Sequence, residues 1–322
     1  MHAVQFTTTG GPEVLAWVEV DEPVPGPTDL VVRLAAAGLN FIDTYHRSGL
    51  YQVPLPFTPG SEGAGTVVAV GERCARFRVG DRVAWGSGGG SYAELVRVPE
   101  AVAVAVPDGV DLEKAAAVML QGMTAHYLVR DTFPLASGQR CLIHAGAGGT
   151  GLLLIQMAHH IGAEVFTTVG SPDKAELARA AGADHTILYR DVDFGEAIEQ
   201  LVGPKAIDVV YDGVGKAVFE RSLEVLRVRG MMVTFGNASG PPDPIAPLRL
   251  SQLGSLFLTR PVLFHYISNR ADLERRAGDV FAAMADGWLD VRIGERVPLR
   301  SAAEAHRLLE GRSTTGKVLL VP

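Results

Sequence analysis

The chain has 322 residues, and at roughly 150 residues per domain this length predicts two domains, each with a core of its own. Hydrophobic residues make up 47% and charged residues 20%, which excludes a disordered or fibrous protein and indicates a water-soluble one. The formal net charge of −7 at pH 7 opposes binding to nucleic acid and to anionic membranes.

The cysteines and the N-terminus bear on the compartment. Cys74 and Cys141 are the only cysteines, so a disulfide framework and a four-thiolate zinc site are both excluded. Residues 1–10 lack a basic stretch followed by an apolar run, and no segment reaches about 18 apolar residues in succession. We therefore expect a cytoplasmic protein without a membrane segment.

The first third of the chain alternates short β-type runs with turn residues. The predicted strands are Val14–Val20, Leu30–Ala35, Gly65–Val70, Asp81–Trp85, Tyr92–Val98 and Val102–Val106. Because these runs are short and closely spaced, they predict an all-β unit, either barrel-like or sandwich-like.

From about Ala115 the pattern changes to alternating helices and strands. A helix is predicted over Ala115–Leu128, and the next strands are Arg140–Ala145, Glu164–Val169, His185–Tyr189, Ala206–Tyr211 and Met231–Phe235. The helices between them are Gly151–Ile161, Pro172–Ala181, Phe194–Val202 and Val218–Val228. Ser171 is placed to cap the second of these helices, with Pro172 at its first position. Apolar strands joined by crossover helices predict a parallel sheet covered on both faces.

The last sixty residues are predicted to form helix Ala271–Gly287, strand Val291–Val297, helix Ala302–Glu310 and strand Lys317–Val321. Such a tail either extends the parallel sheet or returns to the first domain. The pattern of residues alone leaves both arrangements open.

A glycine-rich loop separates the strand that ends at Ala145 from the helix near Gly151. Its sequence, Gly146-Ala147-Gly148-Gly149-Thr150-Gly151, satisfies the pattern G-x-G-x-x-G in a strand–turn–helix context. Without Cβ atoms, such a turn lets backbone amides and the positive helix end approach a pyrophosphate. A glycine-rich turn without a ligand is the alternative, but the β/α alternation that follows favours a dinucleotide site.

The end of the next strand distinguishes NADP(H) from NAD. NAD sites usually carry an acid there to hold the ribose hydroxyl, whereas this chain has Gly170-Ser171, with Lys174 one helical turn later. NADP(H) is therefore favoured. Asp173 argues the other way, although an acid in the first turn of a helix also complements its dipole. Lys174 by itself is equally typical of a solvated helix surface, and it is the neighbouring Gly170-Ser171 turn that favours a phosphate contact.

Several motifs together resemble the medium-chain dehydrogenase/reductase superfamily. They are Gly38–Tyr51 (GLNFIDTYHRSGLY), Pro59–Gly65 (PGSEGAG), Val79–Val83 (VGDRV), the Gly146–Gly151 loop and Val209–Gly215 (VVYDGVG). Three motifs resemble the zinc-free quinone oxidoreductase branch, which includes zeta-crystallin: Asn40–Asp43 with Tyr45 and Gly49–Tyr51, Thr167–Gly170 with Lys174, and Phe235–Gly240 (FGNASG). The resemblance covers essentially the whole chain.

The resemblance implies a GroES-like β-barrel domain and a Rossmann-type, doubly wound parallel sheet domain. Its expected domains are residues 1–121 (GroES-like, substrate), 122–262 (NADP(H)-binding) and 263–322 (return to the GroES-like domain). The active cleft is expected between the two domains, and a homodimer is implied through the sheet domain.

The same resemblance argues against zinc. Zinc-dependent relatives carry a cysteine and a histidine where this chain has Asn40 and Ser61, neither of which is a good zinc ligand. Glu62 remains, but a single carboxylate does not make a site. His46 is a further candidate ligand, although a lone histidine is more often a packing residue. We therefore predict no metal.

Catalytic roles are predicted for Asn40, Tyr45 and Tyr51, with Asn40 bonding the nicotinamide side and the tyrosines stacking on, or donating to, a planar acceptor. Both tyrosines are also consistent with a purely lining role. Thr124, a hydroxyl at a predicted helix start, is assigned to the cofactor by resemblance. The loop, the strand ends and the resemblance together assign cofactor binding to Asn40, Thr124, Gly146, Gly148, Gly149, Thr150, Gly151, Gly170, Ser171, Lys174, Tyr189, Gly213, Phe235, Gly236, Asn237 and Arg312. Tyr189 is also consistent with a packing role at the end of a strand, and Arg312 with a solvated position in a loop.

The predicted function is NADPH-dependent reduction of quinones, or of another planar electrophilic small molecule, by zinc-free transfer of a hydride or of single electrons. A quinone suits a metal-free site because its reduction gives a delocalised anion, so holding cofactor and acceptor face to face supplies most of the acceleration. Reduction of an enone or alkenal double bond on the same scaffold is the alternative enzyme. A nucleotide-responsive or RNA-binding protein is the alternative of another class, which the negative net charge opposes.

Overall fold

The structure, a computed structural model, describes residues 1–322. The chain forms two compact units. Unit 1 comprises residues 1–123, 267–285 and 291–322, and unit 2 comprises residues 124–266 and 286–290.

Unit 1 is built on a mixed, mainly antiparallel sheet with the strand order β14-β15-β3-β4-β5-β7, in which β6 also pairs with β3. Its strands are β3 (Asp29–Gly38), β4 (Gly63–Val70), β5 (Arg82–Trp85), β6 (Leu95–Pro99), β7 (Val104–Ala105), β14 (Ile293–Pro298) and β15 (Lys317–Val321). A separate hairpin joins β1 (His2–Gln5) to β2 (Ala16–Glu19). Strand β15 pairs antiparallel with the end of β3, so the last strand of the chain belongs to the same sheet as the strands of its first third.

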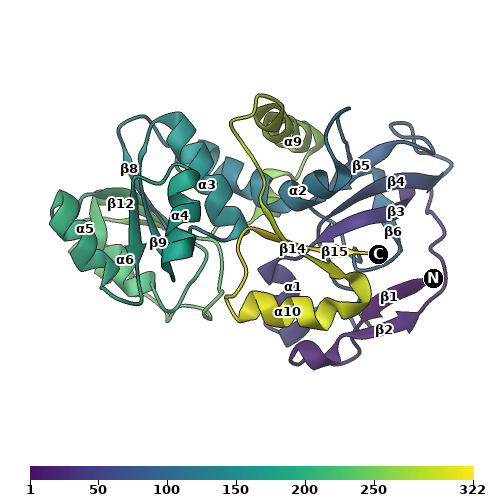
Figure 1. Ribbon diagram of the computed structural model, residues 1–322, viewed down its shortest axis with the longest axis horizontal. Coiled ribbons are helices and arrows are strands. Elements are labelled where there is room, and N and C mark those ends of the chain that lie inside the picture. The colour runs from purple at the N-terminus through teal and green to yellow at the C-terminus, as the bar shows by residue number, and fades with distance from the viewer. The chain divides into compact units, whose positions relative to one another are not determined.

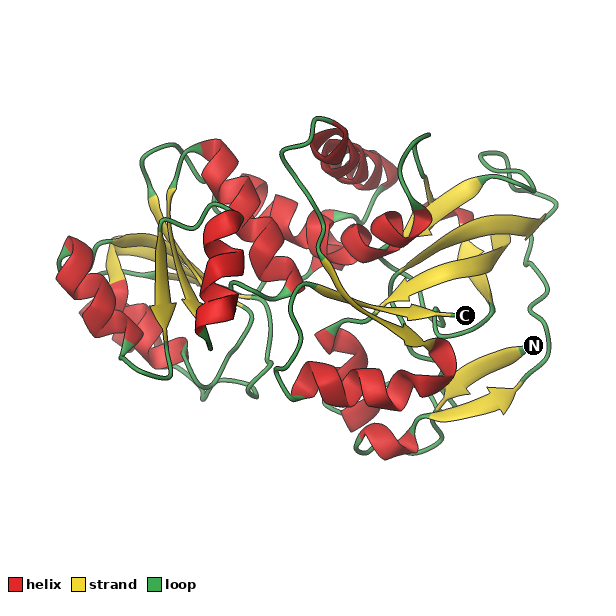
Figure 2. Cartoon of the chain, in the orientation of Figure 1, coloured by secondary structure: helices red, strands yellow, loops and turns green.

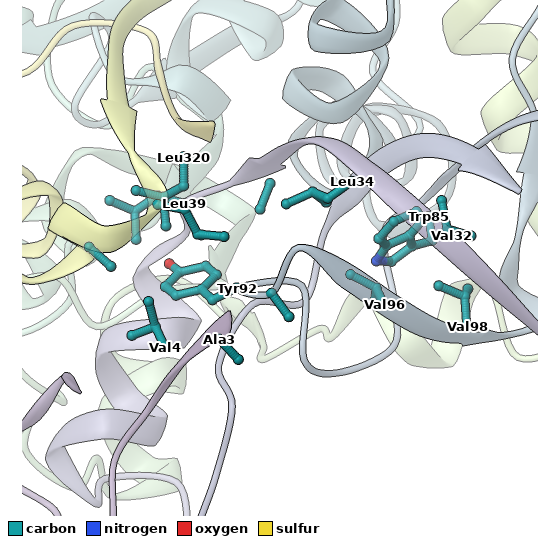
Figure 3. Packing of buried hydrophobic residues seen from close by; sticks show 14 of the residues in the cluster. Ala3, Val4, Val32, Leu34, Leu39, Trp85, Tyr92, Val96, Val98 and Leu320 are labelled. Carbon is teal, nitrogen blue, oxygen red and sulfur yellow. The ribbon is translucent and has the colours of Figure 1, made fainter. Parts of the chain in front are cut away.

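Helices cover parts of this sheet. They are α1 (Phe41–Ser48), α9 (Arg270–Ala285) and α10 (Ala302–Glu310), with one-turn helices η1 (Pro12–Val14), η2 (Glu100–Val102) and η4 (Leu299–Ser301). Figure 1 shows α10 beside α1. The core beneath them contains Tyr92, which lies among Ala3, Val4 and Leu39 in Figure 3, and Trp85.

Helix α2 (Leu112–Tyr127) contains the boundary between the units, and a π-helical turn, η3 (Leu128–Thr132), continues it in unit 2. Thr124 therefore lies near the end of a helix, and the expectation that it starts one is wrong. The helix itself was predicted, over Ala115–Leu128.

Unit 2 is a fully parallel six-stranded sheet with the order β10-β9-β8-β11-β12-β13. Its strands are β8 (Arg140–Ile143), β9 (Glu164–Val169), β10 (His185–Leu188), β11 (Ile207–Asp212), β12 (Leu226–Thr234) and β13 (Phe257–Thr259). Its helices are α3 (Gly149–Ile161), α4 (Pro172–Ala180), α5 (Phe194–Val202), α6 (Phe219–Val225), α7 (Pro247–Gln252) and α8 (Leu263–Tyr266). Helices α3 and α4 cover one face of the sheet, and α5 and α6 cover the other (Figures 1 and 2).

The predicted fold class is confirmed, with differences in a few elements. Helix α1, β1 and β13 were not predicted, because short aromatic and β-branched runs carry little periodicity. The helix predicted over Val218–Val228 ends at Val225, where β12 begins. Ser171 caps α4 as predicted, accepting a bond from the Lys174 amide at 3.4 Å. No helix combines the length and apolar character needed to cross a bilayer.

Candidate functional site

The glycine-rich loop of unit 2 leaves no space for side chains. A Cβ added at Gly146 would lie 2.0 Å from Thr167 Oγ1, and one added at Gly151 would lie 2.4 Å from the Ala145 carbonyl oxygen. Gly148 is less crowded, with that carbonyl at 3.2 Å. Ala145 has a left-handed backbone (φ 56°), the conformation that starts the tight turn.

Helix α3 begins at Gly149, directly after this turn, and no side chain caps it. The amides of its first turn, at Gly149, Thr150 and Gly151, have no partner within the helix because the i−4 carbonyls precede its start. Amides and helix dipole together favour an anion. The loop therefore fits the pyrophosphate of a dinucleotide.

A second group of residues gathers at the end of β9. A Cβ at Gly170 would lie 2.8 Å from Tyr189 Oη and 3.5 Å from Arg190 Nε, so both side chains reach over this glycine. Lys174 is close enough to interact with Tyr189 and Arg190, and its pKa is lowered, chiefly by burial. A phenol and two cations around a Gly-Ser turn can hold a phosphate. Arg190 was not among the predicted residues, although it directly follows the predicted Tyr189.

The ends of β11 and β12 form a third part of the loop region. A Cβ at Gly213 would lie 3.1 Å from the Phe235 ring, and one at Gly236 would lie 2.3 Å from the Gly213 carbonyl oxygen. The Asn237 amide, oriented to satisfy both neighbours, donates to the Gly236 carbonyl at 2.9 Å and accepts from Arg260 Nη2 at 3.1 Å. These close contacts bring four of the predicted residues together.

Two buried titratable groups underlie these loops. His144 lies between two hydroxyls, with Nδ1 2.9 Å from Thr168 Oγ1 and Nε2 2.8 Å from Ser222 Oγ, and burial lowers its pKa to about 3. Ser222 itself donates to the Val218 carbonyl, so it accepts the Nε2–H of a neutral imidazole. Asp212 accepts from the Val214 amide at 2.7 Å, and burial raises its pKa to about 6.

In unit 1, the Asn40 side chain has its hydrogen-bonding positions filled by protein groups. Its Oδ1 accepts from Lys317 Nζ at 2.9 Å and from Gln121 Nε2 at 3.1 Å. Its Nδ2 donates to Glu62 Oε2 at 2.7 Å and to the Gly38 carbonyl at 3.1 Å. In this conformation Asn40 has no position left for a ligand, so its contact with the nicotinamide stays a prediction.

Glu62 and Lys317 form a fully buried ion pair next to Asn40. Besides Lys317, the Glu62 carboxylate accepts from Asn40 and, through Oε1, from the Leu120 amide at 2.7 Å. Burial lowers the pKa of Lys317, while the Glu62 charge acts in the opposite direction. Lys317 and Gln121 were not among the predicted residues, because no local pattern connects them with Asn40.

Helix α1 is held by a second buried network. Asp43 Oδ2 accepts from the Asn40 amide at 2.9 Å and from Tyr92 Oη at 3.2 Å, and burial raises the pKa of Asp43 to about 7. Tyr92 also contacts His306 Nε2 at 3.2 Å, and His306 Nδ1 lies 3.0 Å from Arg47 Nη1. Because arginine only donates, His306 is neutral with its proton on Nε2, and burial with the Arg47 charge lowers its pKa to about 3. Arg47 forms two further bonds, of 2.8 and 2.9 Å, to Glu310 of α10.

The predicted tyrosines belong to an aromatic cluster on and after α1. The Tyr45 and Tyr51 rings meet edge to face with centroids 5.3 Å apart, and Phe41 lies 6.3 Å from Tyr45. Tyr45 is buried, whereas Tyr51 is 36% exposed. His46 packs edge to face against Phe57, and burial lowers its pKa, as expected for a packing histidine. An exposed ring beside a buried one can receive a planar molecule.

Two predicted residues remain, Thr124 and Arg312. Thr124 is a buried residue of α2. Arg312 is an exposed residue of the loop before β15, with a left-handed backbone (φ 56°). Their contacts with a cofactor stay predictions.

Comparison with known proteins supports this description. The alcohol dehydrogenase GroES-like domain model matches residues 26–108, and the zinc-binding dehydrogenase model matches residues 149–279. Quinone oxidoreductase of Pseudomonas aeruginosa is 47% identical over 99% of both chains, and 2-haloacrylate reductase of a Burkholderia species is 42% identical over 97% of this chain and 96% of that one. The crystal structure of Escherichia coli quinone oxidoreductase complexed with NADPH has a TM-score of 0.98 at 40% identity and covers 100% of both chains.

A GroES-like unit and a parallel-sheet unit with a glycine cradle define an oxidoreductase of the medium-chain dehydrogenase/reductase superfamily. Within that superfamily the chain belongs to the quinone oxidoreductase family. The family resemblance seen in the sequence is thereby confirmed.

The zinc implied by one family model does not fit the residues present. Zinc sites draw about three or four ligands from Cys, His, Asp and Glu, and nowhere in the 322 residues do three such side chains gather in a metal-binding arrangement. The Glu62 carboxylate is bonded to Asn40 and paired with Lys317, so it is not available as a metal ligand. A metal ion brought to this cluster would meet the ammonium charge of Lys317.

Proposed function

We propose that the chain catalyses NADPH-dependent reduction of quinones and uses no metal ion for it. The observation that carries the metal-free part is the Lys317 ammonium, bonded to Glu62 and Asn40 where a metal would need open ligands. When bound, NADPH supplies a hydride, and hydride plus one proton converts a quinone into a hydroquinone. Free cysteines are in keeping with our further proposal of a cytoplasmic location.

The chain's own residues bind and orient both reactants in this proposal. The backbone amides of Gly146–Gly151 donate hydrogen bonds to the pyrophosphate. The 2′-phosphate is held by Lys174, Tyr189 and Arg190. Tyr45 and Tyr51 receive the planar acceptor, and the proton comes from water or from the Tyr45 hydroxyl. Asn40 acts by positioning α1, since its amide is occupied.

Cofactor preference tests the first half of the proposal. Fluorescence titration of the wild type should give tighter binding of NADPH than of NADH. Lys174→Ala and Arg190→Ala should each remove about tenfold of NADPH affinity, the equivalent of one phosphate contact, and leave NADH unchanged. Arg179→Ala is the matched control, because Arg179 pairs with Glu176 near the C-terminal end of α4. Equal binding of the two cofactors by the wild type would contradict the assignment.

Acceptor specificity tests the second half. With NADPH and chelator-treated protein, quinones should be turned over in preference to alkenals, and Tyr51→Ala should raise KM for the quinone more than it lowers kcat. Loss of activity on chelation, with recovery on adding a metal, would contradict the metal-free reaction.

A second candidate function is reduction of an activated carbon–carbon double bond. The 42% identity to a 2-haloacrylate reductase favours it, because the two chains match over nearly their whole length. Preferential turnover of haloacrylates or alkenals in the same assay would select this activity. A protein that binds NADPH but consumes none with any acceptor would instead select the nucleotide-responsive or RNA-binding role.

We further propose a homodimer formed through the sheet of unit 2. Strand β13 is an edge strand bonded only to β12, and its Phe257 is 56% exposed. An exposed apolar edge readily pairs with a second copy of itself. Light scattering should give twice the chain mass for the wild type and a monomer for Phe257→Glu. Val192 is similarly exposed and follows the opposite edge strand β10, so the Val192→Glu variant should remain dimeric.

A further inference from the structure

Lys317 is a fully buried lysine whose partners come from the other end of the chain. Its ammonium bonds Glu62 and Asn40, which lie 255 and 277 residues away in sequence. Removing an ammonium and a carboxylate from water costs several kcal/mol per ion, and well-packed apolar residues are often as stable as such a pair. Stability alone therefore does not explain why the fold holds these charges here.

The ammonium imposes an orientation on Asn40. Lysine has no acceptor atom, so the amide oxygen must face Lys317, and the amide nitrogen then faces the Glu62 carboxylate. Without the two charges, the orientation of the amide would depend only on the Gly38 carbonyl and on Gln121, whose own side-chain amide can reverse. Asn40 directly precedes α1, and its own backbone amide is bonded to Asp43 in the first turn.

The side chains of Glu62 and Lys317 are packed closely against the backbone at Gly38. A Cβ at Gly38 would lie 2.3 Å from Glu62 Oε2 and 2.6 Å from Lys317 Cε. Both side chains thus press against the segment that leads into α1. A shift of either one must move residues 38–40 and, through them, the helix that carries Tyr45.

We propose that Lys317 is a positioning residue for the acceptor site: it fixes the Asn40 amide and the start of α1, and so places Tyr45 and Tyr51. This inference rests on the proposed function for its kinetic consequence, but its structural consequence does not depend on the substrate.

The test compares Lys317→Met, Glu62→Gln and the double variant with the wild type. Lys317→Met leaves a buried carboxylate without its cation and should lower the urea midpoint of unfolding, which the uncharged double variant should largely recover. The double variant should nevertheless lose at least about tenfold in kcat/KM for the quinone, because the amide is no longer oriented. Its Kd for NADPH should stay within about twofold of the wild type, since the cofactor loop lies in unit 2. Arg227→Met, which removes an ion pair with Asp208 in unit 2, is the control and should not change KM for the quinone.

Hydrogen exchange supplies a readout independent of substrate. In the double variant, amides of residues 40–51 should exchange about tenfold faster than in the wild type, while those of β8 and α3 should be unchanged. Either a wild-type kcat/KM or unchanged exchange of residues 40–51 in the double variant overturns the proposal. If the wild type reduces no quinone, the proposed function fails, and the exchange experiment still decides the role of Lys317.

Discussion

The cofactor region of unit 2 offers backbone amides in a tightly packed glycine turn, whereas the acceptor region of unit 1 depends on buried charged side chains. Around Gly146 and Gly151 a single methyl group would collide with the chain. Around Asn40, the ammonium of Lys317 and the guanidinium of Arg47 are nearly or fully buried and bonded to carboxylates. The first region should therefore be sensitive to added volume, and the second to removed charge.

The largest effect should come from adding volume to the loop. Gly151→Ala places a Cβ 2.4 Å from the Ala145 carbonyl, which cannot move without distorting the turn. We expect a loss of about 3 kcal/mol in the free energy of unfolding and of measurable NADPH binding. Gly148→Ala, 3.2 Å from the same carbonyl, is the matched control and should cost much less stability. Equal costs in urea titrations would show that the loop tolerates volume.

Removing charge from unit 1 should have the next largest effect. Arg47→Met takes away two bonds to Glu310, a bond to the Gly10 carbonyl at 3.1 Å and the contact with His306. We expect a cost of about 2 kcal/mol, since bonds to charged groups are worth more than neutral ones. Arg307→Met breaks an exposed pair with Glu304 and should cost less than about 0.5 kcal/mol. Similar midpoints for the two variants would mean that the burial of Arg47 contributes nothing.

The same difference explains what the sequence predicts and what it does not. The cradle of unit 2 lies within one strand–turn–helix segment, so its glycines and the Gly170-Ser171 turn can be recognised from local spacing. Lys317, Gln121 and Glu310 reach the Asn40 region through tertiary packing, and no local pattern connects them with it. The strands and crossover helices of unit 2 follow from their apolar periodicity for the same reason.

Acidification should have a moderate effect on the free energy of unfolding, because His144 and His306 are both buried in the neutral form. The folded pKa of His144 is about 3 and its ordinary value 6.5, so the unfolded chain binds one more proton between these pH values. The stability that neutral His144 contributes is complete above pH 6.5 and is lost as the pH falls. The His144→Gln variant does not have this loss. Its free energy of unfolding should therefore approach that of the wild type by about 1.4 kcal/mol per pH unit from pH 6 to 4.

Asp212 acts in the opposite direction in the same unit. Its folded pKa is about 6 against 3.8, so its contribution is present at low pH and is lost as the pH rises through 6. In unit 1, Asp43 has a folded pKa of about 7, so its effect on the pH dependence of stability is likewise opposite to that of His306. Urea titrations at pH 7.5, 6, 5 and 4 should show parallel behaviour for His144→Gln and His306→Gln. A constant difference from the wild type across this range would contradict the neutral histidines.

The smallest expected effect concerns backbone strain in the loop. Ala145 adopts a left-handed conformation (φ 56°) that costs a residue with a Cβ roughly 1 kcal/mol, and its side chain is exposed. Ala145→Gly relieves this strain but gives the unfolded chain more freedom, so we expect a net gain of at most about 0.5 kcal/mol. Arg229→Gly removes a similar strain (φ 59°) in β12 and should give a comparable gain.

The two glycine variants should differ in cofactor binding, which separates strain from preorganisation. Ala145 holds the turn that aims the first amides of α3, and its carbonyl accepts the Gly148 amide at 2.9 Å. A glycine there permits other turn conformations, so Ala145→Gly should weaken NADPH about two- to fivefold, while Arg229→Gly should leave it unchanged. If both variants bind NADPH as the wild type does, the glycines on either side fix the loop without help from Ala145, and the contrast between a backbone-built region and a charge-built one becomes sharper.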